Sequence, residues 1–407
     1  MNDRTMENIK KEKKHSLPKG WEIKMLSEIA EVGAGNSAPQ KKELFINGRH
    51  PFIRTSDVGQ IRKGFINSSV DNLNDEGIKK LKIKKKGTIL FPKSGASTFL
   101  NHRVMMEIDG YVSSHLATIK AKDSVALDRY LLYFLITIDA KDLMQDIAYP
   151  SLKISDISAI EIPLPPLPEQ QRIVAILDET FSAIDKAKAN AEQNLKNAKE
   201  LFESYLNKVF AGSTDTKTKH KNWEEKKLGE VIEYDKNQNI HKGLPFVGLE
   251  NIESNSGKFI GSLSPQEVKS STFYFNKQHV LYGRLRPYLN KVLLPDFEGH
   301  CSTEIFPIKV SKKITREFLF YWLILGSTVK KINATWTGAR MPRANMNQVL
   351  EFNFSFPSLK EQQAIVHKLD TLRIETQKLE SIYQKKILLL EELKKSILQK
   401  AFSGELN

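Results

Sequence analysis

Apolar residues recur every seven positions in two long stretches of the chain. In the first, residues 169–212, no proline occurs, and no glycine occurs before Gly212. Two apolar columns three positions apart form the a/d pattern of a coiled coil, which predicts one long helix that ends near Gly212. The columns contain Val174, Phe181, Leu195, Phe202 and Val209, and Leu177, Ile184, Ala191, Ala198 and Tyr205.

A second stretch, residues 361–403, shows the same pattern. Its columns contain Ile365, Leu372, Leu379 and Leu393, and Leu369, Tyr383, Leu390 and Ile397. A lysine interrupts each seam, Lys188 in the first helix and Lys386 in the second. A polar residue in a seam either fixes the register of the helix pair or extends its charge to solvent, and the sequence leaves both readings open.

The two helical stretches are copies of one unit. Residues 168–174 return as residues 360–366, and residues 206–212 return as residues 398–404, both 192 positions later. A repeat of this size indicates a duplicated domain and a pseudo-twofold molecule. Because the first helix leaves the first domain and arrives at the second, two packed seams must run antiparallel. The two ends of the chain should then lie close together.

The segments before each helix show short apolar runs separated by Gly, Asn, Asp and Ser, which is typical of strands and turns. A helix is predicted at 128–138 with Asp128 as its N-cap. The expected fold class is α/β (α+β), with two globular domains separated by two long antiparallel helices. The expected parts are a disordered basic tail (1–16), a first domain (17–167), a first helix (168–212), a linker (213–221), a second domain (222–359) and a second helix (360–407).

Charge and composition narrow the class of partner. The formal net charge is +14 and the pI is about 9.4, an excess that favours a polyanion such as nucleic acid. The lone cysteine, Cys301, excludes an internal disulfide, fits a reducing cytoplasm and is expected in a core. No apolar run is long enough to cross a membrane, and the first residues lack the apolar region of a signal peptide.

Catalytic motifs are missing from the sequence. No phosphate-binding loop, no dinucleotide fingerprint and no metal-ligand spacing of histidines is present, and Gly33-Ala34-Gly35 lacks the third glycine. We therefore expect a protein that is not an enzyme and that carries no cofactor and no metal.

A short motif precedes each long helix. A proline-rich turn is followed by Glu-Gln, and the residues are Pro165, Glu169 and Gln170 in the first copy and Pro357, Glu361 and Gln362 in the second. With the helix ends at 208–212 and 400–406, this arrangement resembles the specificity subunit of type I restriction–modification enzymes. The second turn departs from the family's pattern at Ser358 and Lys360.

The resemblance implies a non-catalytic subunit that binds double-stranded DNA. The globular domains would be target-recognition domains that each read half of a bipartite, asymmetric site. The helices would set the spacer and dock methyltransferase subunits, with translocase/endonuclease subunits as further partners. An adaptor that spaces two protein-binding domains on a coiled-coil rod is the alternative reading.

Polar clusters in the expected loops supply the candidate DNA contacts, because arginine pairs with guanine and amides pair with adenine. The alternative for each cluster is an ordinary solvated loop. In the first domain the candidates are Arg54, Thr55, Ser56, Lys93, Ser94, Asn101, Arg103, Tyr149, Ser151 and Lys153. In the second they are Arg284, Arg286, Tyr288, Asn290, Arg340, Arg343 and Asn345. The 192-residue offset also makes the loop around Ser151 equivalent to the loop around Arg343.

Overall fold

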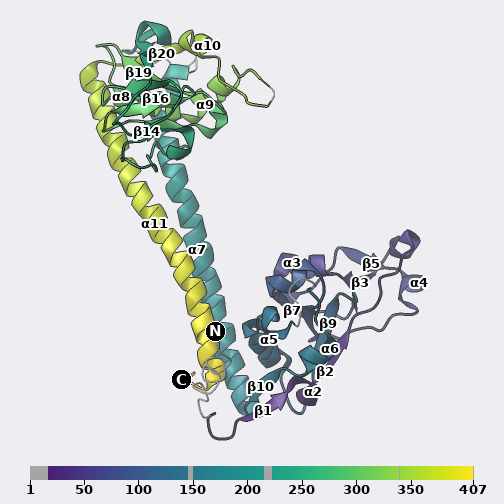
Figure 1. Cartoon of the computed structure of the whole chain (residues 1–407). Helices are drawn as coiled ribbons and strands as arrows, with labels where there is room; N and C mark the ends of the chain where they lie inside the picture. Colours follow the sequence, from purple (N-terminus) through teal and green to yellow (C-terminus); the bar gives the residue numbers. More distant parts are fainter. Residues whose placement is uncertain (1–16, 145–149, 215–221, 339, 407) are drawn as a thin grey trace. The chain divides into compact units, whose positions relative to one another are not determined.

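The structure, a computed structural model, describes residues 17–144, 150–214, 222–338 and 340–406. The chain divides into two compact units, which we call unit 1 (residues 1–190 and 386–407) and unit 2 (residues 191–385). Each unit contains one α/β domain and one stretch of each long helix (Figure 1). The expected tail at 1–16 and the linker residues 215–221 lie outside the described residues.

The two predicted long helices are α7 (Leu167–Thr214) and α11 (Leu359–Ser403). In unit 1, Lys188 Nζ lies 2.6 Å from Glu391 Oε1, and Asp185 Oδ1 lies 2.9 Å from Lys394 Nζ. The residue number rises along one helix as it falls along the other, so the segments are antiparallel, as predicted. Lys188 therefore reaches across the seam to an acidic partner on the other helix.

The predicted seam holds for α7 but only in part for α11. Every column residue named for α7 is buried or half-buried. On α11, Leu379 and Leu393 are 38% and 46% exposed, so assigning them to the seam was wrong. A straight α-helix drifts by about 20° per heptad against a seven-residue repeat, which rotates one column out of the interface. The helix α7 also continues two residues beyond Gly212.

The domain of unit 1 is built on two sheets. The larger has the strand order β2-β9-β6-β7-β4, and the smaller has the order β5-β3-β8. The strands are β2 (Ala30–Ala34), β3 (His50–Ile53), β4 (Lys63–Ile66), β5 (Asp71–Leu73), β6 (Ile89–Pro92), β7 (Arg103–Met106), β8 (Tyr111–Val112) and β9 (Leu116–Ala121). A short pair, β1 (Glu22–Met25) with β10 (Glu161–Leu164), brings the start of the domain to its end.

The domain of unit 2 repeats this plan with changes. Its sheets have the orders β12-β19-β16-β17 and β13-β15-β18-β14, and β11 (Glu224–Lys227) pairs with β20 (Asn353–Phe356). The remaining strands are β12 (Ile232–Tyr234), β13 (Gln238–Asn239), β14 (Phe246–Val247), β15 (Thr272–Phe275), β16 (Val280–Gly283), β17 (Val292–Leu293), β18 (Gly299–Cys301) and β19 (Ile305–Val310). Cys301 is a buried core residue, as predicted.

A mostly buried helix packs each domain against the long helices. It is α5 (Asp128–Thr137) in unit 1 and α8 (Arg316–Ile324) in unit 2. The prediction of the first helix is confirmed, but its N-cap is Leu127. The carboxylate of Asp128 instead accepts a hydrogen bond from the Ala121 amide, at 2.9 Å.

The glutamine of each helix-start motif fastens a long helix to its domain. The buried Gln170 accepts from the Leu127 amide (2.9 Å) and donates to the carbonyls of Val125 (3.1 Å) and Pro165 (2.9 Å). The buried Gln362 makes the same three bonds, to the Thr315 amide and to the Lys313 and Pro357 carbonyls. Glu169 pairs with Arg172, whereas the Glu361 amide bonds with Ser358 Oγ at 3.4 Å.

The end of the other long helix also packs on each domain. In unit 1, the Phe402 ring lies 5.3 Å from Tyr130 and 5.1 Å from Phe134 between ring centroids. In unit 2, Phe210, 192 residues earlier, lies 5.1 Å from Phe318. Each domain is thus held by the start of one long helix and the end of the other. Pro18 lies against Gly404, which confirms that the described ends of the chain meet.

Candidate nucleic-acid interface

Two loops meet beyond the end of strand β6 in unit 1. Residues Ser94 and Ser151 form an isolated antiparallel bridge, and the Leu152 amide donates to the Lys93 carbonyl at 2.8 Å. A turn between β8 and β9 completes the group, because Ser94 Oγ lies 2.8 Å from His115 Nδ1. We call these three segments, residues 93–97, 150–153 and 113–116, the loop platform of unit 1.

Unit 2 builds the same platform beyond strand β16. Its segments are residues 284–290, 342–345 and 302–305. Leu285 and Arg343 form the equivalent bridge, and the Ala344 amide donates to the Arg284 carbonyl at 2.9 Å. The two bridges confirm the predicted equivalence of the loops around Ser151 and Arg343.

The two platforms share a backbone and differ in chemistry. In unit 2, the carboxylate of Glu304 accepts from Arg284 Nε at 3.1 Å and from Arg343 Nη2 at 2.7 Å. The hydrogen bond from Arg343 holds the pKa of Glu304 below its usual range. In unit 1 the equivalent position holds His115, whose partner is the hydroxyl of Ser94. At this position one platform therefore holds two arginines around a carboxylate, and the other holds a hydroxyl against an imidazole.

His115 and Glu304 are not among the predicted DNA contacts. Both occupy the third position of a turn that follows a buried strand, in Ser113-Ser114-His115-Leu116 and in Ser302-Thr303-Glu304-Ile305. Their carbonyls accept from the Lys93 amide (3.0 Å) and the Arg284 amide (2.9 Å). The shared Ser-Ser/Thr-x-Leu/Ile pattern is the signal that would have found them.

Two candidates, Arg103 and Asn290, are buried, so assigning them as DNA contacts was wrong, and the half-buried Asn101 uses its side chain within the domain. Arg103 is fully buried, with its Cζ atom 3.2 Å from the centroid of the Phe91 ring, and burial lowers its pKa to about 9. Asn101 donates to Asp139 Oδ1 at 2.9 Å and accepts from the Ala140 amide, which closes the turn. Asn290 is 3% exposed and occupies the left-handed region with a φ of 45°.

The other candidates remain at the surface or at its edge. On the unit 2 platform, Arg286 and Tyr288 are exposed, as is Arg340 next to it, while the Asn345 side chain caps α10 (Met346–Leu350). On the unit 1 platform, Ser151 and Lys153 are exposed and Lys93 and Ser94 are half-buried. Tyr149 lies outside the described residues.

A second group of candidates borders the unit 1 platform at the start of α3 (Thr55–Ile61). The Ser113 amide donates to the Ile53 carbonyl at 2.9 Å, which places Arg54 next to the His115 turn. The guanidinium of Arg54 pairs with Asp71 and lies over the Phe45 and Phe52 rings. Of its neighbours, Ser56 is exposed and Thr55 is half-buried.

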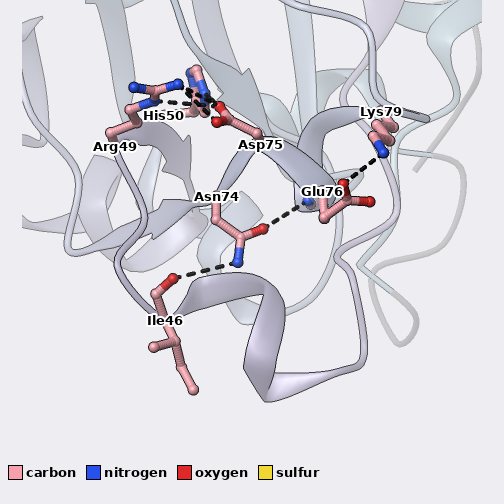
Figure 2. A network of polar contacts seen from close by, with 8 residues as sticks. Ile46, Arg49, His50, Asn74, Asp75, Glu76 and Lys79 are labelled. Atoms are coloured by element: carbon pink, nitrogen blue, oxygen red, sulfur yellow. Dashed lines mark hydrogen bonds and ion pairs between the residues drawn. The ribbon is translucent and has the colours of Figure 1, made fainter.

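A polar network at the smaller sheet of unit 1 has a structural role (Figure 2). The carboxylate of Asp75 lies 2.7 Å from Arg49 Nη2 and 2.7 Å from His50 Nε2. Asn74 Oδ1 accepts from the Gly77 amide at 3.0 Å and thereby caps α4 (Asp75–Ile78). The Asp75 carboxylate thus joins Arg49 and His50 to the start of α4.

The described part of the chain gives no sign of a metal centre or a membrane span. Within it, no group of three or more His, Cys, Asp or Glu residues could hold a metal ion. None of its helices is both long and apolar enough to traverse a bilayer.

The chain is similar to known proteins over nearly its whole length. The family model for the type I restriction modification DNA specificity domain matches residues 18–197 and again residues 220–388. The MjaIX specificity subunit of Methanocaldococcus jannaschii is 24% identical, with 96% of this chain and 94% of that protein aligned. The EcoDI specificity subunit of Escherichia coli is 22% identical, with 96% and 89% aligned. Both of these relatives are specificity subunits of type I restriction enzymes.

Solved structures show the same fold. One chain, from work on complex assembly and conformational transition of the type I R-M system, gives a TM-score of 0.73 at 19% identity, covering 96% of this chain and all of that one. The HsdS subunit from Thermoanaerobacter tengcongensis gives a TM-score of 0.60 at 20% identity, covering 97% and 99%. At this identity the likeness establishes the architecture of two α/β domains with packed long helices.

Proposed function

Since the chain belongs to the type I restriction modification DNA specificity family, we propose that its two loop platforms read the two halves of one bipartite DNA site. The chain is a DNA-specificity subunit, a non-catalytic component of a type I restriction–modification system. The family match decides against the alternative of a protein adaptor. We assign residues 17–167 and 222–359 as the two target-recognition domains.

One observation carries the proposal of separate half-sites. The same backbone platform recurs in both units, with Ser94, Ser151 and His115 in one and Leu285, Arg343 and Glu304 in the other. Bases are distinguished by side-chain donors and acceptors on a fixed frame. Two copies of a frame with different side chains are suited to an asymmetric site.

The helices supply the second part of the proposal. We assign residues 168–212 and 360–407 as the segments that set the spacer and dock methyltransferase subunits, with translocase/endonuclease subunits completing the assembly. Exposed apolar side chains on α11, such as Leu388 and Leu389, support a protein partner along this helix. We further propose that the complex acts in the cytoplasm, where the host carries its DNA.

Exchange of one domain tests the two-reader proposal. Replacing residues 17–160 by the equivalent segment of a related specificity subunit should change one half of the recognised sequence and leave the other half intact. Sequencing of methylated sites in the host genome reads both halves in one experiment. Exchange of the loops alone, residues 93–97 and 150–153, sharpens the test. A simultaneous change in both halves would show that the domains do not read separately.

A further inference from the structure

Glu304 joins the two arginines of the unit 2 platform. Its carboxylate accepts from Nε of Arg284 at 3.1 Å, from Nε of Arg343 at 3.0 Å and from Nη2 of Arg343 at 2.7 Å. The Glu304 side chain is only 20% exposed, while those of Arg284 and Arg343 are 32% and 37% exposed. The acid therefore lies beneath two guanidinium groups that reach the surface.

The two arginines are held in different ways. The Nε–Nη2 edge of Arg343 is occupied by the carboxylate, so this edge is not available for a bidentate contact with a base. Arg284 uses only Nε for Glu304, and its guanidinium lies over the Phe306 ring, with Cζ 5.0 Å from the centroid. Among the described residues, Nη1 and Nη2 of Arg284 have no hydrogen-bond partner. Those two groups form the end of the fork that matches O6 and N7 of guanine.

We propose that Glu304 is a positioning residue that aims the free Nη edge of Arg284 at a guanine in the half-site read by unit 2. Arg343 holds the Glu304 carboxylate in place for this role. This inference rests on the proposed function of the platform. The carboxylate offers two oxygens that accept only, so it orients both arginines at once. A glutamine in its place has one acceptor and an amide that donates, so the same shape no longer holds both guanidinium groups.

A positioning role for Glu304 predicts that specific and non-specific binding respond differently to its substitution. Glu304→Gln leaves Arg284 free to rotate, so discrimination at one G·C pair should fall about tenfold, within the range for a bidentate arginine contact. The substitution also adds one positive charge beside the DNA, so affinity for random duplex should stay equal or rise. A residue that only stabilises the fold would lower both affinities together.

The experiment uses the full-length chain and a pool of randomised duplexes. Selection with the wild-type protein first defines the two half-sites, and competition with single-base variants then measures discrimination for each protein. Glu304→Gln and Arg284→Ala should lose preference at the same G·C pair, whereas Glu304→Asp, which keeps the charge, should retain most of it. Glu298→Gln is the matched control, because it removes an exposed acid of the same domain that pairs with Tyr274 away from the platform.

Several outcomes would overturn the inference. It fails if Glu304→Gln preserves discrimination at every position, if it weakens specific and random DNA equally, or if Arg284→Ala affects a different base pair. The Arg284→Ala comparison remains decisive if Glu304→Gln does not fold. Failure of the wild-type protein to select any bipartite sequence would instead contradict the proposed function itself.

Discussion

Equivalent positions on the two long helices have opposite surroundings in the two units. Phe181 on α7 and Arg373 on α11 lie 192 residues apart and follow the same start motif. Arg373 lies over the Phe320 ring, with Cζ 5.2 Å from the centroid, and donates to the Ser256 carbonyl. Phe181 instead lines an open cavity of about 570 Å³. The position borders a cavity in unit 1 and holds an arginine packed on the domain in unit 2.

The residues next to these two positions also differ between the units. In unit 2 the turn before Phe259 contains Gly257, which has a φ of +65° and packs so closely on Phe320 that a Cβ atom would lie 2.5 Å from the ring. In unit 1, Lys63 at the start of β4 lines the cavity. Because Gly257 has no side chain, the turn of unit 2 can pack against Phe320 on α8. The contacts of Gln170 and Gln362 with their domains are the same in both units, whereas the side-chain packing between each domain and its long helices differs.

The largest expected effect comes from the aromatic residue that ends each long helix. Phe210→Ala and Phe402→Ala each empty a buried aromatic site and should each cost about 3–5 kcal/mol. The first should loosen unit 2 and the second unit 1, because each ring packs on one domain only. Hydrogen exchange followed by mass spectrometry measures the amide protection of each unit separately.

Matched controls lie on the same helices. Leu201→Ala and Leu393→Ala remove exposed leucines, 50% and 46% exposed, that are also 192 residues apart. Each should change stability by less than about 0.5 kcal/mol. If Phe402→Ala loosened unit 2 rather than unit 1, the pairing of each helix end with one domain would be wrong.

A smaller effect is expected at the two glutamine clamps, which are the side chains of Gln170 and Gln362 that hold each long helix to its domain. Gln170→Ala and Gln362→Ala each leave one buried amide and two carbonyls without their partner, which should cost about 2–3 kcal/mol in total. The two losses should be equal, since both side chains make the same three bonds. Chemical denaturation gives the values, and Gln171→Ala and Gln363→Ala, on exposed neighbours, are the controls. Clearly unequal losses would mean that the clamps are not equivalent.

The smallest expected effect is a difference in acid sensitivity between the smaller sheet of unit 1 and the sheet β13-β15-β18-β14 of unit 2. Burial lowers the pKa of His300, which lies 2.9 Å from Thr272 Oγ1 and 2.9 Å from the Gln266 carbonyl. A lowered histidine pKa contributes stability that is present above about pH 6.5 and is lost as the pH falls further. Hydrogen bonds from His50 and Arg49 lower the pKa of Asp75, so its contribution persists down to about pH 4.

Hydrogen exchange at pH 5 should therefore show weaker protection of β18 than at pH 7, with protection of β3 unchanged. The variant His300→Gln, which does not titrate, should lose this pH dependence. Equal loss in both sheets at pH 5 would show that other groups control the acid response.

The sequence correctly predicted how the two long helices are arranged. The two long helices, their antiparallel packing and the meeting of Pro18 with Gly404 all follow from a heptad pattern and a repeat, which depend on local spacing and chain order. The sequence also identified Gln170 and Gln362 through their motif, although not the bonds that they make. The equivalence of the loops around Ser151 and Arg343 followed from the same offset.

Only the tertiary structure decided which polar residues face outward. Arg103 belongs to a residue type that pairs with guanine, but the strand β7 turns it under Phe91, and no local pattern distinguishes it from Arg284. The importance of Glu304 arises because two loops distant in sequence bring Arg284 and Arg343 to its carboxylate. Helix period and chain order are properties of neighbouring residues, whereas the direction of a loop side chain is set by contacts between segments far apart in the chain.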